Sequence, residues 1–344
     1  MKLTFEQIKS AASGATSVFE DVCGVCFRRF TPPQAAAVLA NRPETILTVQ
    51  SCPGVKLMFR TDSATLGLSV EIFPRPQNRH FFAVDVCADG KFVGSLDNFS
   101  DQTIPDDYGD SFRPQETRRE GTLSLGAGEK LVSVYLPWSM PFCLYALELD
   151  DGASFAPAVP EKHAIFYGDS ITQGFDALHP RLTLASRIAD AFGVQQNNKA
   201  IAGDGVLATL AVPRDDFDPE FVFIAYGAND WWRHTREQFH DEYRAFLGSV
   251  TKNYPGVPVF SLAPLTRGDS DDMRLMGPFH TMRDVISLVA AEFRDVTVID
   301  CSDFFPADPL LYSDGRLHPN DRGFELYFNK LFPRLSAVMD ARHG

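Results

Sequence analysis

The chain has 344 residues, of which 44% are hydrophobic and 22% are charged, and 45 acidic against 32 basic residues give it a net charge of −13. This composition is typical of a globular protein with one large or two ordinary domains. The negative charge argues against nucleic acid or an anionic membrane as a partner, because phosphate groups bind to basic surfaces. The sequence has no apolar run of membrane-spanning length and its N-terminus lacks a signal-peptide core, so we expect a cytoplasmic protein that is not bound to a membrane.

The first part of the chain, residues 1–157, is rich in short apolar or alternating runs separated by turn residues. Two early helices are expected at 4–12 and 34–39. Strands are expected at 45–50, 55–60, 64–72, 80–86, 91–96, 121–125, 130–136 and 144–149. Glycines 126 and 128 are expected in a hairpin between two of these strands, rather than in a nucleotide-binding loop. The pattern predicts an antiparallel β-sandwich of the jelly-roll type.

A proline-rich stretch at 156–160 predicts a domain boundary, which we place so that the second domain comprises residues 158–344. Five apolar runs in this part alternate with helical patterns, and they are expected as strands at 162–167, 195–201, 221–226, 257–263 and 296–300. Helices are expected up to residue 193 and at 235–253, 279–293 and 322–339. Such alternation predicts an α/β fold of three layers, α/β/α, with a five-stranded parallel sheet.

Six cysteines occur, five of them in the first half, and Cys23 and Cys26 have a Cys-x-x-Cys spacing. That spacing is compatible with metal or redox chemistry. Because no second Cys or His pair stands at ligand spacing, the favoured interpretation is buried free thiols, and no metal is expected.

Three short motifs follow expected strands or lie near the C-terminus. Gly168-Asp169-Ser170 follows the strand at 162–167, and Asn229 follows the strand at 221–226. Asp314 and His318 precede the last helix. In α/β sheets, ligands bind beyond the carboxyl ends of the strands, so these residues supply a nucleophile, an amide donor and an oriented base. Each motif alone also fits an ordinary cap or turn; Asp169 is expected to be a local backbone acceptor.

Together these motifs resemble the four sequence blocks of the SGNH (GDSL-like) hydrolase superfamily, over about residues 162 to 340. The remaining block corresponds to Gly203 in Asn197-Asn198-Lys199-Ala200-Ile201-Ala202-Gly203-Asp204. The resemblance implies a flavodoxin-like hydrolase domain in which Ser170 is the nucleophile and His318 the general base. It also implies that the oxyanion is held by the backbone N–H groups of Ser170 and Gly203 and by the Asn229 side chain. No cofactor is required by this chemistry.

The spacing between Asp314 and His318 is one residue longer than the family's usual Asp-x-x-His. Three interpretations remain open: Asp314 reaches the histidine through a bulged turn, another acid such as Asp303 replaces it, or a backbone carbonyl orients the imidazole. We favour Asp314.

The layout of a sandwich before the hydrolase domain also resembles two-domain carbohydrate esterases. We therefore expect a serine esterase for short-chain carboxylic esters that deacetylates a small or carbohydrate-like substrate. Trp231 and Trp232, which follow Asn229-Asp230, are candidate sugar-stacking residues, although a buried tryptophan at a loop base is equally common. The alternatives are a lysophospholipase or thioesterase, and a carbohydrate-binding protein that has lost activity. The sequence does not indicate an oligomeric state.

Overall fold

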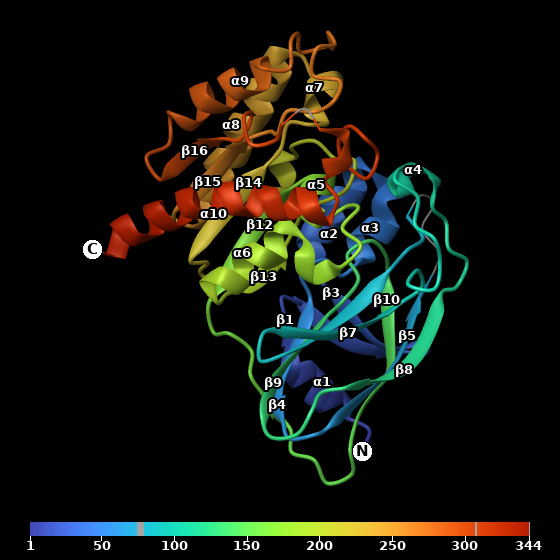
Figure 1. Ribbon diagram of the computed structural model, residues 1–344. Coiled ribbons are helices and arrows are strands. Elements are labelled where there is room, and N and C mark those ends of the chain that lie inside the picture. The colour runs from blue at the N-terminus through green and yellow to red at the C-terminus, as the bar shows by residue number, and fades with distance from the viewer. Residues whose placement is uncertain (74–78, 307, 344) are drawn as a thin grey trace.

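The computed structural model describes residues 1–73, 79–306 and 308–343. The first half of the chain forms two antiparallel sheets, and the second half forms a parallel sheet covered by helices on both faces (Figure 1). The predicted fold class, a β-sandwich followed by a three-layer α/β/α domain, is therefore confirmed. None of the helices in the described ranges has both the length and the hydropathy needed to cross a bilayer.

The β-sandwich consists of two sheets whose strands come from residues 12–157. One sheet contains β1 (Ala12–Ser13), β4 (Lys56–Thr61), β6 (Ala83–Ala88), β7 (Lys91–Asp97), β9 (Lys130–Tyr135) and β11 (Ala156–Pro157). The other contains β2 (Ser17–Asp21), β3 (Gly24–Arg28), β5 (Thr65–Ile72), β8 (Arg118–Ser124) and β10 (Phe142–Leu149). The strand orders are β1-β4-β9-β6-β7, with β11 beside β4, and β2-β3-β10-β5-β8.

The inner faces of the two sheets form one apolar core. Strand β5 shows why: its residues alternate between half-buried and buried, so Leu66, Leu68, Val70 and Ile72 all point inward. Each aliphatic side chain that is fully buried in this way contributes about 1.5–3 kcal/mol to folding. Helix α1 (Phe5–Ala11) closes one end of the core, and it begins with the predicted capping box of Thr4 and Gln7.

The second half of the chain is built on a parallel sheet in the order β13-β12-β14-β15-β16. Its strands are β12 (His163–Gly168), β13 (Gln195–Asn198), β14 (Phe221–Ala225), β15 (Val259–Ala263) and β16 (Val296–Asp300). The accompanying α-helices are α5 (Ser170–Gln173), α6 (Leu184–Phe192), α7 (Asp230–Arg233), α8 (Arg236–Asn253), α9 (Thr281–Ala290) and α10 (Asp321–His343). This is the flavodoxin-like strand order, 2-1-3-4-5, and it places β12 at the topological switch point where ligands bind.

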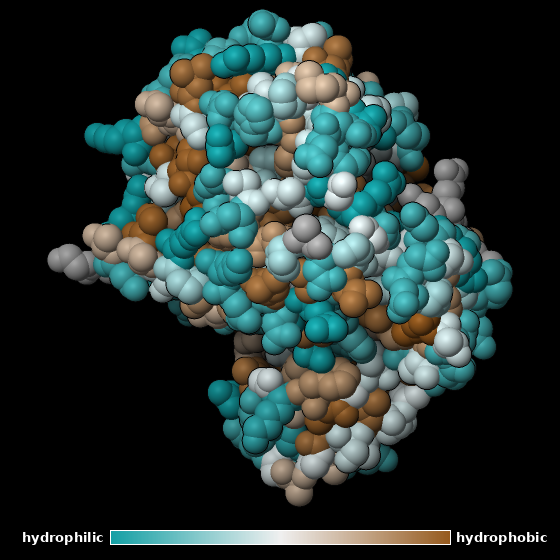
Figure 2. Space-filling model, turned by 45° about the horizontal axis from the view of Figure 1, so that its top comes forward, coloured by the Kyte–Doolittle hydropathy of each residue, from teal (hydrophilic) through white to brown (hydrophobic). Residues whose placement is uncertain are grey.

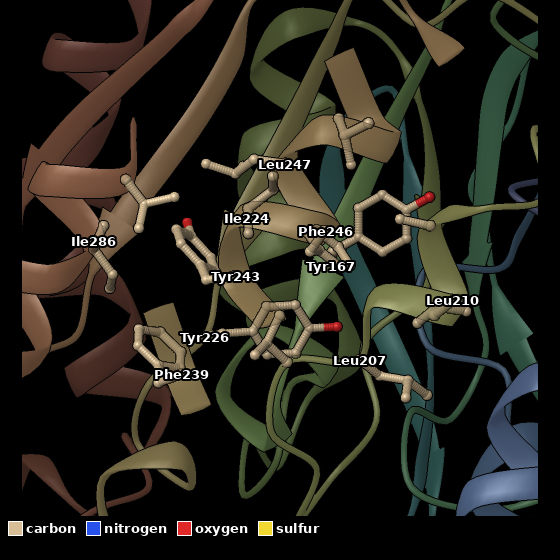
Figure 3. Close-up of a cluster of buried hydrophobic side chains, with 14 of the residues drawn as sticks. Tyr167, Leu207, Leu210, Ile224, Tyr226, Phe239, Tyr243, Phe246, Leu247 and Ile286 are labelled. Atoms are coloured by element: carbon tan, nitrogen blue, oxygen red, sulfur yellow. The ribbon is translucent and has the colours of Figure 1, made fainter. Parts of the chain in front are cut away.

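Alternate residues of the central strands pack against different helix layers. Ile165 and Ile224 belong to a core shared with helices α8 and α9. Figure 3 shows Ile224 in this cluster with Phe246 and Ile286. Phe166 and Phe223 face the opposite way, into a core shared with α6 and α10. Burial on both faces explains why these strands read as continuous apolar runs in the sequence.

A segment of the first half packs on the second. Helices α2 (Pro32–Asn41) and α3 (Ile46–Gln50) contribute Val38 and Val49 to the same core as Ile165 and Tyr167. The boundary at 157/158 stays a prediction, but the apolar contacts cross it.

Two local predictions are wrong, and one hairpin was not predicted. Residues 45–50 were expected as a strand, but residues 46–50 form α3, because burial of Val49 against the second half outweighs the β propensity of this short run. Gly126 and Gly128 do not lie in a hairpin: they link β8 of one sheet to β9 of the other. The hairpin of β2 and β3 was not predicted, although its turn has a glycine, Gly24, at φ 99°.

Candidate active site

Ser170 lies at the carboxyl end of β12 and begins helix α5. Asp169 is the N-cap of this short helix, and its Oδ1 accepts a hydrogen bond of 3.0 Å from the backbone N–H of Ile171. The role expected for Asp169 as a local acceptor agrees with this contact. Burial raises the pKa of Asp169 to about 7, against the opposing effect of that hydrogen bond.

Ser170, His318 and Asp314 form a hydrogen-bonded chain. The Oγ of Ser170 lies 2.9 Å from Nε2 of His318. On the other side of the ring, Nδ1 of His318 lies 2.8 Å from Oδ2 of Asp314. When Nδ1 carries the proton and donates a hydrogen bond to the carboxylate, Nε2 is unprotonated and its lone pair faces the serine hydroxyl.

The longer spacing between Asp314 and His318 is accommodated by a tight turn. Oδ1 of Asp314 accepts hydrogen bonds from the backbone N–H groups of Arg316, Leu317 and His318, at 3.1, 2.8 and 3.2 Å. The turn continues through Gly315 at φ 68°. Burial opposes ionisation of Asp314, but these bonds and the bond to His318 outweigh it and hold the pKa of the carboxyl well below its usual range.

The other acid considered for this position, Asp303, is exposed in the loop after β16. Its backbone carbonyl oxygen accepts a hydrogen bond from Lys330. Of the two acids, Asp314 is the one that contacts the imidazole.

Gly203 and Asn229 lie on neighbouring loops that are hydrogen-bonded to each other. The amide Nδ2 of Asn229 donates to the backbone oxygen of Asp204, at 2.8 Å. An amide nitrogen carries two hydrogens, so Asn229 retains one for a substrate. Gly203 has φ 76°, and a Cβ built there would meet only Arg42, at 4.0 Å, so the glycine is required by backbone conformation rather than by space.

Two residues that sequence reasoning missed fix this loop. Arg42, the C-cap of α2, donates from Nη1 to the backbone oxygen of Gly203 and to Oδ1 of Asp204, both at 2.7 Å. Gln173 of α5 accepts from the backbone N–H of Ala202 at 2.7 Å. Arg42 lies 161 residues away in the chain and belongs to no motif, so nothing local in the sequence marks it.

A second carboxylate lies near His318. Oδ2 of Asp176 is 3.7 Å from Nδ1 of His318, and the side chain is fully buried. The Oγ of Ser313 donates to the same oxygen at 2.5 Å, and Nη2 of Arg79 donates to it at 2.9 Å. Asp176 was not predicted from the sequence; its unusual backbone, at φ 70°, is visible only in the structure.

Asp176, Asp314 and His318 have ligand atoms within 4.8 Å of one another, a spacing that could hold a metal ion. Here these atoms already have hydrogen-bond partners in the protein. Nδ1 of His318 is bonded to Asp314, and Asp176 is bonded to Arg79 and Ser313. We therefore interpret these three residues as a hydrogen-bond network around His318 rather than as a metal site.

The three tryptophans have different environments. Trp231 is 0% exposed, packs on Phe279, and donates from Nε1 to the backbone oxygen of Gly277 at 2.7 Å. Of the two interpretations given for Trp231, a buried tryptophan at a loop base is the one that its lack of exposed surface supports. Trp232 is 49% exposed, and it remains a candidate. Trp138 of the first half is buried against Phe175 of the second.

A surface cavity of about 370 Å³ lies next to Asp314, the acid that is hydrogen-bonded to His318. Asp314 and Gly315 line it, together with Pro309, Leu310 and Tyr312, and residues 104–108 from the first half of the chain form another wall. The β-sandwich half therefore shapes the surroundings of Asp314.

Comparison with known proteins gives one family match. Residues 166–326 match the family of GDSL-like lipases and acylhydrolases. No curated protein sequence matches the chain.

Solved structures share the two-part fold at low sequence identity. A salicylyl-acyltransferase from a tetracycline biosynthetic pathway, SsfX3, is 21% identical with a TM-score of 0.76, over 95% of this chain and 94% of its own. A candidate GDSL-like lipase from Bacteroides ovatus is 18% identical with a TM-score of 0.74, over 99% and 98%. A family two carbohydrate esterase from Clostridium thermocellum, solved with cellohexaose, is 15% identical with a TM-score of 0.60, over 84% and 94%. The second half of this chain therefore carries a domain that matches the GDSL-like lipase/acylhydrolase family over residues 166–326, in a fold that these solved structures share.

Proposed function

We propose that the protein is a serine esterase that hydrolyses short-chain carboxylic esters, with Ser170 as nucleophile, His318 as general base and Asp314 as its orienting acid. The observation that carries the proposal is the continuous chain of hydrogen bonds, 2.9 Å from Ser170 to His318 and 2.8 Å from His318 to Asp314. Nucleophile, base and orienter in hydrogen-bond contact are the arrangement that acyl transfer to serine requires.

In the first step, Oγ of Ser170 attacks the ester carbonyl carbon while its proton passes to Nε2 of His318. The carbon–oxygen bond of the ester then breaks, and the same proton moves to the leaving alkoxide. In the second step, a water molecule attacks the acyl-serine, gives its proton to His318, and releases the carboxylic acid and free Ser170. Asp314 stabilises the imidazolium that forms in both steps.

The negative oxygen formed in each step needs fixed donors. We assign this role to the backbone N–H groups of Ser170 and Gly203 and to the free N–H of the Asn229 amide. Ser170 begins helix α5, so its N–H belongs to the unpaired donors of a helix start. Arg42 and Gln173 hold the Gly203 loop from two sides, which keeps its donor in place before substrate binds.

The substrate we propose is an acetylated or otherwise short-acylated carbohydrate. Trp232 is the exposed aromatic nearest in sequence to Asn229, and its indole is suited to stacking on a sugar face. Hydrophobic residues on the face shown in Figure 2 occur in small groups between hydrophilic ones, which favours a polar substrate over a lipid. The esterase similar in fold that was solved with cellohexaose is consistent with such a substrate.

Acyl transfer to an alcohol is a second candidate, because the chain covers almost the full length of an acyltransferase of the same fold. The acyl-serine would be the same, and only the acceptor would change from water to a hydroxyl group. A lysophospholipase or thioesterase would share the first step as well. The idea of an inactive binding protein rested on the longer spacing of Asp314 and His318, which their contact of 2.8 Å makes unnecessary.

The test is hydrolysis of p-nitrophenyl acetate, butyrate and octanoate, followed by an O-acetylated oligosaccharide. We expect the acetate to be turned over fastest, and Ser170→Ala to abolish turnover. The control Ser10→Ala changes an exposed serine of α1 and should have no effect. Preference for octanoate would overturn the short-chain assignment, and equal rates for the wild type and Ser170→Ala would overturn the serine mechanism. Faster product formation with added sugar alcohol, with the ester of that alcohol as product, would favour transfer.

A further inference from the structure

Three cysteines from distant parts of the sequence meet on the second sheet of the sandwich. Cys23 lies in the turn that joins β2 to β3, and Cys26 lies on β3. Cys143 lies on β10, directly opposite Cys26 in the antiparallel register. The sequence offered only the Cys23–Cys26 pair, because the third member is 117 residues away.

The sulfur atoms are spaced as in a metal thiolate centre. The Sγ of Cys26 lies 3.7 Å from that of Cys23 and 3.6 Å from that of Cys143, and all three sulfurs lie within 4.8 Å of one another. Zinc–sulfur bonds of about 2.3 Å at tetrahedral angles place pairs of sulfurs roughly 3.8 Å apart. One cation can therefore contact all three sulfurs after small adjustments of the side chains.

We propose that Cys23, Cys26 and Cys143 bind one zinc ion as thiolates, with a water molecule as the fourth ligand on the solvent side. Cys26 and Cys143 are buried, whereas Cys23 is only partly buried beside Val22, which is fully exposed. The cluster thus has one open side through which an ion and a water molecule can enter. Soft thiolate ligands select zinc over magnesium or calcium.

The three thiols differ in acidity when no metal is bound. The hydrogen bond from Cys143 outweighs burial and lowers the pKa of Cys26 to about 7, and Arg28 acts in the same direction. The pKa of Cys23 is raised by burial, and that of Cys143 is raised by its bond to Cys26 and by burial. A zinc ion supplies the positive charge that deprotonates such thiols, releasing their protons to solvent.

The expected role of the ion is to fasten an edge of the sandwich. β2 is the edge strand of its sheet, and the turn at Gly24 already presses against β10: a Cβ at Gly24 would lie 2.5 Å from the backbone oxygen of Leu144. A metal ion at the turn would link this hairpin to β10 through metal–thiolate bonds. Because the cysteines contact none of Ser170, His318 or Asp314, the ion has no part in the proposed esterase reaction.

The test is metal analysis of the full-length protein purified without chelators. We expect about one zinc per chain, and we expect cobalt substitution to give the intense near-ultraviolet thiolate-to-cobalt absorption. Cys143→Ser should lose both signals and lower the melting temperature. If that variant does not fold, Cys23→Ser in the partly exposed turn gives the same reading. Cys301→Ser is the matched control, because Cys301 is buried in the other half of the molecule and should retain full zinc binding.

Three results would overturn the proposal. The first is wild-type protein without zinc that also gives no thiolate absorption when cobalt is added. The second is equal loss of zinc in Cys301→Ser and Cys143→Ser. The third is a disulfide between any two of the three cysteines in protein whose thiols were blocked at lysis, found by mass spectrometry.

Discussion

Arg79, from the sandwich half of the chain, forms an ion pair with Asp176 of the hydrolase half, with Nε 2.5 Å from Oδ1 and Nη2 2.9 Å from Oδ2. Asp176 is fully buried and stands beside the imidazole of His318, which also contacts Asp314. Two carboxylates thus face one ring nitrogen, and the arginine balances the charge of the more distant one. We therefore expect Asp314 to act on the imidazole, and Asp176 to stabilise the fold through its ion pair with Arg79.

We expect Asp314→Asn to lower kcat by about 10³–10⁴-fold, because the amide cannot fix the ring tautomer or stabilise the imidazolium. Asp176→Asn should instead reduce the free energy of unfolding by about 3–5 kcal/mol, because it breaks a buried ion pair. Steady-state kinetics with p-nitrophenyl acetate and urea unfolding measure the two effects. A larger kcat loss in Asp176→Asn than in Asp314→Asn would reverse the assignment.

Gly203→Ala should lower kcat by about 10–100-fold, because alanine disfavours φ 76° and the loop would shift the N–H that we assign to the oxyanion. Gly193→Ala is the control. Gly193 ends α6 at φ 65°, and a Cβ there meets no atom within 4 Å. Both variants should lose about 1 kcal/mol of stability, but only Gly203→Ala should lose activity. Equal kcat values in the two variants would remove Gly203 from the oxyanion site.

Trp232→Ala should raise KM for an acetylated oligosaccharide by about tenfold while leaving p-nitrophenyl acetate unaffected, because only the sugar offers a face for stacking. One ring face of Trp232 is covered by Arg233, whose guanidinium carbon is 4.4 Å from the ring centre. Trp231→Ala should act differently, costing about 3–5 kcal/mol of stability through a core cavity. An unchanged KM for the oligosaccharide in Trp232→Ala would exclude the stacking role.

Asp169 gives a prediction about pH. Its folded-state pKa of about 7 lies above the usual value near 3.8, so the folded state binds more protons than the unfolded state between these limits. Stability from this group is therefore present at low pH and falls by about 1.4 kcal/mol per pH unit as pH rises toward 7.

Asp169→Asn keeps an oxygen for the N–H of Ile171 and removes the titration. The difference in unfolding free energy between variant and wild type should grow from pH 4 to pH 7 in favour of the variant. Asp271→Asn, in an exposed loop, is the control substitution. The same pH dependence in both variants would show that the Asp169 carboxyl is not the cause.

Much of the hydrolase half was predictable because its signals are local. Strand β12, its glycine and Ser170 follow one another in the chain, and the caps of α1 and α8 are short patterns that the structure reproduces. The meeting of Asp314 with His318 was the favoured interpretation among three, and the turn that permits it is also local.

The supporting residues could not be predicted, because their partners are distant in sequence. Arg79 and Arg42 are single arginines without a surrounding motif, 97 and 161 residues from the groups they bind. The prediction of a strand at 45–50 was wrong for a related reason. The conformation of this segment depends on a core most of whose residues follow it by more than a hundred positions. The pattern of apolar and polar residues within one segment does not indicate which distant residues will pack on it.

The packing of α2 and α3 has a consequence for how the chain is made. A ribosome synthesises residues 32–50 long before strands β12 and β14, which contribute to the same apolar core as Val38 and Val49. During that interval these helices expose apolar surface beside a nearly finished sandwich, so the first half of the nascent chain has to wait for the second to complete its fold. We therefore expect protein fragments that end near residue 157 to aggregate, and the two halves to fold stably only as one chain.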